Sequence, residues 1–477
     1  MMKKSILMSL MLLAFGAAYG AEGDTAKTEP SVPQGPTLEE QVGNVKGSVE
    51  SLTENYLETK TTVDKLAKIK LSGYVQAQWQ YADSMGIRTI AGGNFPVNSQ
   101  QRFQVRRGRL KTTYETTTSR YVLQFDVIPS GLSIKDAYAT IMEPWLKTFS
   151  YTMGIFDRPF GFEIGYSSSS RESPERSRVY QTLFPGERDM GAKLEINPTP
   201  EMGPLQYLNL KGGVFTGMGP TSNEIDNVQD FIGRVGFNAP FYDLNLAIDG
   251  GFSAYLGGVT NTHDSAFSVG TLANGSTGFI VNTGNKMKAF DRTIMGVDGQ
   301  IYYDLPVLGG FSLRGEYLWG KVPTYSSPGT ANGNTFHYAG TPSRNVDNVT
   351  TATAPGIAVG APSALPLYER EVMGWYVNYV QNLGTLFQAM VKYDVFDPNT
   401  KAEGSDIGKS GTGLNATDIM ISTLGLGGIY HWDETVKFVA YYDMVTNEDA
   451  AFTSGTNMAW NRDLSDNVFT FRMQAKF

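Results

Sequence analysis

The sequence contains no cysteine and only three histidines, His263, His337 and His431, which lie far apart. The lack of cysteine argues against a disulfide framework, thiol chemistry and a lipoprotein anchor. The histidine spacing fits neither a metal centre nor a nucleophilic site, and no EF-hand spacing occurs. We therefore expect no catalytic residue, no metal and no cofactor. A net charge of −8 also argues against a nucleic-acid partner.

Long apolar runs are missing as well. Beyond residues 1–20, no stretch approaches the ~20 apolar residues of a membrane helix. Residues 1–20 have the layout of an export signal peptide, with Lys3 and Lys4, an apolar run from Ile6, and a cleavage site expected at Ala18-Tyr19-Gly20. A membrane anchor is the alternative, but the run is short for a bilayer. An exported chain without helical spans is either soluble or a β-barrel.

The residues that are present favour many strands and tight turns. Charged residues make up only 18%, while aromatic residues reach 12% and glycine numbers 53. The stretch "NVFTFRMQAKF" (467–477) alternates apolar and polar side chains, as a strand with one apolar and one polar face does. It is either the last strand of a soluble sandwich or the closing strand of a barrel whose apolar face meets lipid.

Sixteen segments show comparable alternation, and most have the length of a tilted transmembrane strand. They are 69–81, 101–116, 120–128, 133–142, 149–156, 189–196, 206–215, 230–237, 244–255, 290–303, 310–320, 372–381, 385–394, 418–431, 436–444 and 467–477. Short connections such as "TTS" and "QNLG" alternate with long ones such as 157–188 and 321–371, the 129–132 connection excepted. This parity predicts an all-β fold, a sixteen-stranded antiparallel transmembrane β-barrel over residues 69–477 in the bacterial outer membrane.

Two segments separate the export signal from the barrel. Residues 21–36 contain Pro30, Pro33 and Pro36 and read as a flexible leader. Residues 37–68 carry apolar residues at alternating steps of four and three, which predicts an α-helical coiled coil. The alternative is a single helix packed on its own domain. The predicted seam consists of Leu38, Val42, Val45, Val49, Leu52, Tyr56, Val63 and Leu66. Valine at a with leucine at d favours two strands.

The same alternation sorts the charges of the barrel. Basic residues outnumber acidic ones on the face opposite the lipid, which favours the passage of anions. The alternative is that these arginines brace the wall against acidic loop residues. The densest basic patch is "RFQVRRGRLK" (102–111), where a change of parity predicts a bulge near Arg106. The predicted pore-lining residues are Arg102, Arg107, Arg109, Lys111 and Arg120.

The stretch 149–196 resembles the phosphate-selective porin O and P family. The family's G-x-F-x-x-P-F-G-x-E element is matched by Gly154, Phe156, Pro159, Phe160, Gly161 and Glu163. The E-R-S of residues 175–177 and the R-D-x-G of residues 188–191 are also similar, as are the arginine-rich second strand and "IKDAYATI" (134–141). The resemblance covers about residues 69 to 477 and is strongest from 101 to 196.

This resemblance implies a trimeric channel for phosphate-like anions, with residues 157–188 folded inward as a constriction. It implies Lys135 as a pore lysine, although strand parity alone leaves its direction open. The constriction residues would be Arg158, Glu163, Arg171, Glu172, Arg176 and Arg178. The near-balance of charge in this loop departs from a plain anion trap. A homotrimer would also bring three leading helices together, so we predict a three-helix periplasmic stalk, about 43 Å long at 1.5 Å per residue.

Three functions are compatible with these features. The first is a porin for passive diffusion of small hydrophilic solutes that favours anions. The second is a structural protein that tethers or spaces the outer membrane from peptidoglycan through the stalk, with a general pore. The third is a saccharide channel lined by Trp79, Trp319 and Trp375, which ranks last because parity places these residues toward lipid.

Overall fold

A computed structural model describes residues 37–87, 95–96, 98–129, 131–217, 219–220, 227–325, 366–454 and 456–477. The expected export signal (1–20) and the proline-containing leader (21–36) lie outside these described residues. The chain divides into two units, residues 1–65 and 66–477, which are described separately. None of the helices in the described residues is both long and apolar enough to cross a membrane.

The first unit contains the predicted helix, α1 (Leu38–Leu66). Thr37 and Glu40 form a reciprocal capping box at its start, in which Thr37 N donates to Glu40 Oε2 at 3.0 Å and Glu40 N donates to Thr37 Oγ1 at 3.3 Å. Every residue of the predicted seam is at least 55% exposed in the single chain. The helix is therefore confirmed, while its assembly into a coiled coil stays a prediction.

The second unit confirms the predicted barrel. Within the described residues, sixteen antiparallel strands close on themselves through the pairing of β1 with β18, which sets Trp79 opposite Phe471. Closure leaves the barrel without a free sheet edge. A lipid environment requires this closure, because it cannot satisfy the backbone groups of an open edge. The strands are β1 (Ile69–Ala82), β2 (Gln101–Glu115), β3 (Ser119–Ile128), β4 (Gly131–Met142), β5 (Phe149–Asp157), β6 (Arg188–Ile196), β7 (Leu208–Phe215), β8 (Asp230–Phe241), β9 (Leu246–Thr260), β12 (Ala289–Leu305), β13 (Gly309–Tyr325), β14 (Leu367–Leu383), β15 (Phe387–Asp397), β16 (Ile421–His431), β17 (Val436–Asn447) and β18 (Val468–Lys476).

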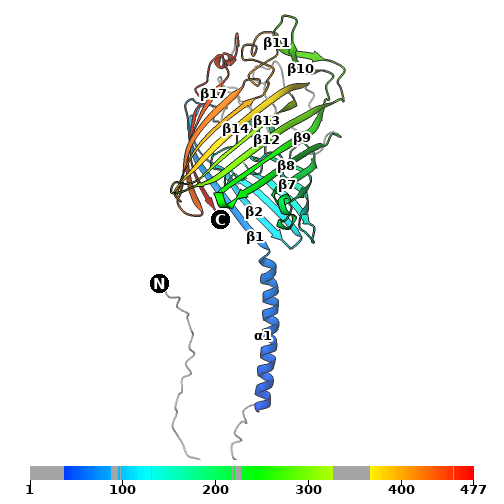
Figure 1. Ribbon diagram of the computed structural model, residues 1–477, viewed down its shortest axis with the longest axis vertical. Coiled ribbons are helices and arrows are strands. Elements are labelled where there is room, and N and C mark those ends of the chain that lie inside the picture. The colour runs from blue at the N-terminus through cyan, green and yellow to red at the C-terminus, as the bar shows by residue number, and fades with distance from the viewer. Residues whose placement is uncertain are drawn as a thin grey trace, which may run out of the picture. The chain divides into compact units, whose positions relative to one another are not determined.

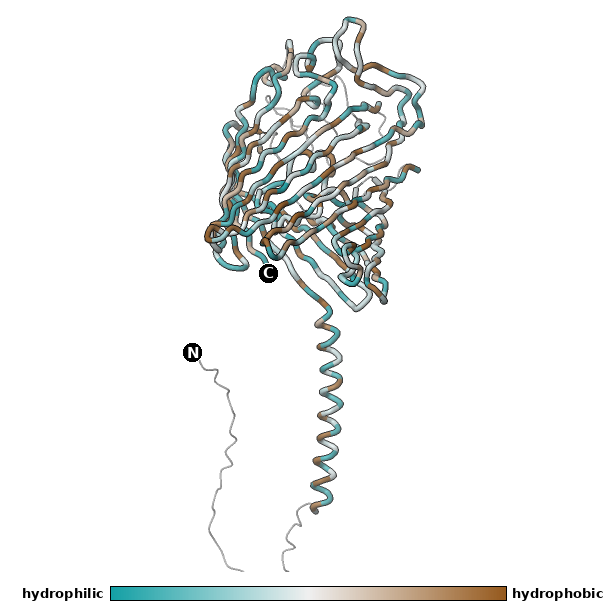
Figure 2. Tube along the Cα trace, in the orientation of Figure 1, coloured by the Kyte–Doolittle hydropathy of each residue, from teal (hydrophilic) through white to brown (hydrophobic). Residues whose placement is uncertain are grey.

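The barrel wall is apolar on its outer face and polar on its inner face. On β1, Gln76, Gln78 and Gln80 are at most 3% exposed, whereas Val75 and Tyr81 are 45% and 40% exposed. The alternation of apolar and polar residues is visible along the strands in Figure 2. A barrel that separates lipid from a hydrated lumen requires apolar side chains on its outer face and polar ones on its inner face.

Two β-bulges interrupt this alternation. Between β1 and β2, Gln76 pairs with Arg107 while Ala77 pairs with Val105, so Arg106 is the extra residue. This confirms the bulge predicted there. Between β3 and β4 the register also shifts, and the extra residue is Lys135. A bulge re-aims the inserted side chain, and each of these two bulges inserts a basic residue.

The connections follow the predicted parity, with additions that the sequence did not reveal. The short connections include two 3₁₀ helices, η1 (Pro200–Tyr207) and η2 (Tyr242–Leu244), and a long one includes η3 (Thr456–Asn461). The 256–289 connection contains a hairpin, β10 (Ala266–Thr271) and β11 (Thr277–Asn282), at the end of the barrel where the long connections lie (Figure 1). β10 pairs in parallel with the start of β14, and Phe267 stacks on Tyr368 with ring centroids 4.5 Å apart.

Some predicted strand ends were wrong. β13 continues to Tyr325 and β14 begins at Leu367, so both extend beyond the predicted limits of 320 and 372. These extensions are paired with each other, and the hydrogen-bonded ladder carries them past the end of the alternating apolar pattern. An apolar cluster that includes Ile407, Leu414 and Trp460 packs the long connections near these extended ends.

Candidate functional site

Residues 158–187, here called the inner loop, connect β5 to β6 and contact distant strands of the barrel. The Ser168 hydroxyl lies 2.6 Å from Tyr74 Oη on β1, and Lys392 Nζ on β15 donates to Glu163 Oε1 at 2.9 Å. Arg472 on β18 donates to the carbonyl oxygen of Pro174 at 2.7 Å. Because inward-facing side chains of β1, β15 and β18 all reach it, the inner loop lies inside the lumen.

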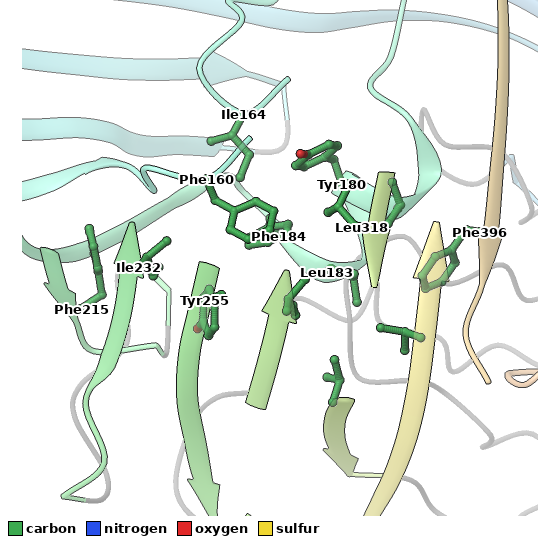
Figure 3. Close-up of a cluster of buried hydrophobic side chains, with 14 of the residues drawn as sticks. Phe160, Ile164, Tyr180, Leu183, Phe184, Phe215, Ile232, Tyr255, Leu318 and Phe396 are labelled. Atoms are coloured by element: carbon green, nitrogen blue, oxygen red, sulfur yellow. The ribbon is translucent and has the colours of Figure 1, made fainter. Parts of the chain in front are cut away.

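An apolar cluster holds one side of the inner loop against the wall. Phe160 and Phe184 pack with ring centroids 4.8 Å apart, and Phe184 also meets the ring of Tyr255 on β9 at 6.0 Å. Figure 3 shows these rings together with Leu183 from α2 (Arg178–Leu183), the short helix of the inner loop. Phe215, Ile232, Leu318 and Phe396 of the wall belong to the same cluster.

A single carboxylate fixes the loop next to that cluster. Glu316 of β13 accepts hydrogen bonds from Tyr180 Oη and Tyr376 Oη, each at 2.5 Å. It also accepts the backbone N–H groups of Phe162 and Glu163, each at 2.7 Å. Four donors converge on this one side chain, which is 4% exposed.

The opposite side of the inner loop meets three arginines, which we call the arginine clamp: Arg106, Arg107 and Arg472. All three bind the carboxylate of Glu175. Arg106 binds in a bidentate way at 2.9 and 3.0 Å, Arg107 Nη2 lies 2.7 Å from Oε2, and Arg472 Nη2 lies 2.9 Å from Oε1. Burial alone would raise the pKa of Glu175, but the charges of Arg106, Arg107 and Arg472 outweigh it and hold this pKa well below its usual value.

The other predicted pore residues of β2 face the lumen with weaker partners. Arg102 donates to the neutral amide oxygen of Gln80 at 2.9 and 2.7 Å. Arg109 is buried and lies 3.6 Å from Asp126. The 3.6 Å separation from Asp126 leaves part of the charge of Arg109 uncompensated.

Lys111, Arg120 and Lys135 differ in their surroundings. Arg120 pairs with Glu115 at 2.6 Å and is largely exposed, close to the short 116–118 turn. Lys135, the bulge residue of β4, lies among the charges of Glu187, Arg109 and other groups. The structure thus gives Lys135 the inward direction that parity left open. Within the described residues, neither Lys111 nor Lys135 forms an ion pair within 4.0 Å.

The predicted constriction residues lie in two groups. Some pair with the wall: Arg158 with Asp189 at 3.1 Å, and Glu172 with Arg314 at 2.8 Å. Glu163, besides its contact with Lys392, accepts the Ser177 hydroxyl at 2.5 Å. Such pairs brace the loop rather than line an open path.

In the second group, the side chains of Arg171 and Arg176 bond within the loop, whereas Arg178 contacts the wall. Arg176 donates to the backbone oxygens of Glu163 and Ile164 at 2.8 and 3.0 Å and pairs with Glu187. The backbone N–H of Arg178 donates to Asp394 at 3.4 Å. Within the described residues, Arg171 forms no ion pair with a carboxylate, and its side chain donates to the carbonyl oxygens of residues 173 and 174, each at 3.3 Å.

Sequence reasoning left out some of these features. Arg106 was absent from the predicted pore residues, although a bulge turns the inserted side chain inward. The sequence marks Glu175 as part of the E-R-S match and of the loop's nearly balanced charge, but its three arginine partners come from two strands that are distant in sequence. Trp79, Trp319 and Trp375 lie on the outer face, as parity predicted. Among the described residues, no group of three or more His, Cys, Asp or Glu side chains could hold a metal ion.

The architecture and the loop folded into its lumen define a class of fold, that of the bacterial outer-membrane porins. The chain is similar to OprB of Pseudomonas putida, with 9% identity, a TM-score of 0.51, and coverage of 87% of this chain and 96% of that one. An anion-selective porin from Comamonas acidovorans gives 11% identity, coverage of 86% and 99%, and a TM-score of 0.48. OmpF of Salmonella typhi has 10% identity and a TM-score of 0.47, with coverage of 86% of this chain and 97% of that one. At these identities the likeness shows the fold alone.

No protein-family model matches the sequence, and no curated protein matches it. Membership of the phosphate-selective porin O and P family therefore stays a prediction.

Proposed function

We propose that this protein is an outer-membrane porin through which small hydrophilic solutes diffuse passively, with a preference for anions of the phosphate type. The porin fold and the apolar outer face support a channel in outer-membrane lipid. The inner loop, held inside the lumen by side chains from several strands, supports a narrow path. In a narrow lumen with low-dielectric walls, fixed charges act strongly on a passing ion.

The observation that carries the anion preference is the uncompensated positive charge on the β2 and β4 side of the lumen. Arg109 has only a loose partner at 3.6 Å, and Lys111 and Lys135 form no ion pair in the described residues. The arginine clamp adds three guanidinium groups that share one carboxylate. This wall attracts anions and repels cations.

The reversal potential in a potassium chloride gradient tests this proposal. We expect the wild-type channel to be anion-selective. The double variant Arg109→Gln/Lys111→Gln should lose much of that selectivity, because two lumen cations are removed. Lys401→Gln is the matched control, since Lys401 is a half-exposed basic residue of a long connection, paired with Glu371. Cation selectivity of the wild type would refute the anion preference.

We also propose that α1 joins copies of the chain into a homotrimer and forms a periplasmic stalk near peptidoglycan. The exposed apolar seam supports this, because a sustained heptad seam is stable only against partner helices. Deleting residues 38–66 should loosen the attachment of the outer membrane without changing single-channel conductance. An unchanged envelope contradicts the tether, and cross-linked species of two rather than three copies contradict the trimer.

A further inference from the structure

We propose that Glu175 is a built-in competitor for the permeating anion. Its carboxylate occupies an oxyanion site formed by the arginine clamp, and a small phosphate-like oxyanion binds there by displacing it. This inference rests on the proposed anion preference and goes one step further, since it assigns the binding site and a regulatory role to a residue of the inner loop.

The geometry of the clamp is that of an anion site. Guanidinium groups bind planar or tetrahedral oxyanions in pairs of parallel N–H···O bonds, and Arg106 holds Glu175 in this way. Arg107 from the same strand and Arg472 from β18 approach the same two oxygens, and their side chains are only 7% and 3% exposed. The clamp is therefore preformed by the barrel wall, whereas the carboxylate comes from the loop.

The clamp also has more positive charge and more donors than Glu175 can satisfy. Arg171 lies close enough to Glu175 and Arg107 to interact with their charges, and its buried Nη1 atom has no hydrogen-bond partner among the described residues. The buried Nε2 atom of Gln78 also has no partner in this part of the chain, while its Oε1 accepts from Arg472. Burial and the charge of Arg176 lower the pKa of Arg171 to about 9, as expected where cations are crowded.

A tetrahedral oxyanion fits this surplus better than a carboxylate does. It offers up to four oxygens, so it accepts from the three clamp arginines and leaves acceptors for the unpartnered donors of Arg171 and Gln78. An uncompensated buried charge is costly, and a bound dianion removes more of that cost than one carboxylate. Arg106 is 28% exposed, so the clamp is reachable from the lumen.

The inner loop does not depend on Glu175 for its position. Its apolar side is held by the cluster around Phe160 and Phe184, and its other anchors are Glu316 and the pair of Glu163 with Lys392. The Glu175 side chain can leave the clamp while these contacts remain. The exchange therefore requires a side-chain movement rather than displacement of the whole loop.

Block of chloride current by inorganic phosphate tests the inference in planar bilayers that contain the full-length protein. We expect Glu175→Gln to lower the half-blocking phosphate concentration by at least about tenfold, because each 1.4 kcal/mol of lost competition gives a factor of ten. Glu371→Gln is the control, since Glu371 also pairs with a cation, Lys401, and belongs neither to the inner loop nor to the arginine clamp. It should leave the half-blocking concentration unchanged. Glu175→Asp, which is one methylene shorter, should give an intermediate value.

The possible results separate this inference from the proposed function. Suppose that the wild type is anion-selective, but the half-blocking phosphate concentration of Glu175→Gln and Glu175→Asp equals or exceeds that of the wild type. Glu175 then only braces the loop, and the inference is wrong. If the wild type is cation-selective, both the inference and the anion preference fail. Should Glu175→Gln not assemble, the Glu175→Asp channel alone decides, with a lowered half-blocking concentration as the supporting result.

Discussion

Replacement of Glu316 by leucine should release the part of the inner loop that carries Phe162. The substitution removes the acceptor of four donors, two phenol groups at 2.5 Å and two backbone N–H groups at 2.7 Å. A buried donor left without an acceptor costs about 1–3 kcal/mol. Because lumen water can satisfy some of these donors, we expect a total of roughly 2–6 kcal/mol in favour of release.

The apolar cluster still holds the loop in this variant, so the expected result is fluctuation rather than full detachment. Single-channel recordings in planar bilayers should show a larger mean conductance and more open-channel noise than the wild type. Glu316→Gln keeps one acceptor oxygen, so its conductance and noise should lie between those of the wild type and those of Glu316→Leu. If Glu316→Leu has the conductance and noise of the wild type, Glu316 does not hold the loop and the reasoning is refuted.

Three further predictions concern the same loop. Gly161→Ala should also increase channel noise, because Gly161 has a φ of +61° and an added Cβ would clash with Tyr180 Oη; wild-type recordings from this variant would contradict the steric argument. Lys392→Met should destabilise the loop by about 3–5 kcal/mol, since it leaves the buried Glu163 carboxylate unpaired; a channel as resistant to loop proteolysis as the wild type would argue against it. The difference in conductance between the wild type and Glu175→Gln should stay constant between about pH 7 and pH 5, because the lowered folded-state pKa of Glu175 means that its contribution is present above the unfolded value near 4.5 and is lost only as the pH falls through the lowered pKa; a change of that difference within this window contradicts this assignment.

The strands were predictable because one face of each meets lipid. Alternation such as Phe469, Phe471 and Met473 against Thr470 and Arg472 has few other physical causes, and the bulge near Arg106 is visible as a change of parity in a single strand. The second bulge, at Lys135, lies in a stretch whose two parities are equally plausible. The hairpin β10–β11 escaped prediction because strands of six residues carry too little alternation.

The contacts of the inner loop were less predictable, for a different reason. Parity shows that a side chain enters the lumen but not what it meets there. Glu175 binds Arg106 and Arg472, residues 69 and 297 positions away, and no local pattern encodes such pairings. The charges of the loop therefore appeared nearly balanced in the sequence, while the structure divides them between bracing pairs and a crowded cationic side.

The central claim is that alternate side chains of one closed barrel face lipid and a conducting, water-filled lumen. The natural absence of cysteine allows a direct test with single cysteines at neighbouring positions of β2. We expect a water-soluble, negatively charged thiol reagent to modify Lys111→Cys and to reduce the anion current through reconstituted channels. Leu110→Cys, whose side chain faces lipid, should remain unmodified with its current unchanged. Equal modification at both positions, or no steps of current from the wild-type protein, would contradict the claim.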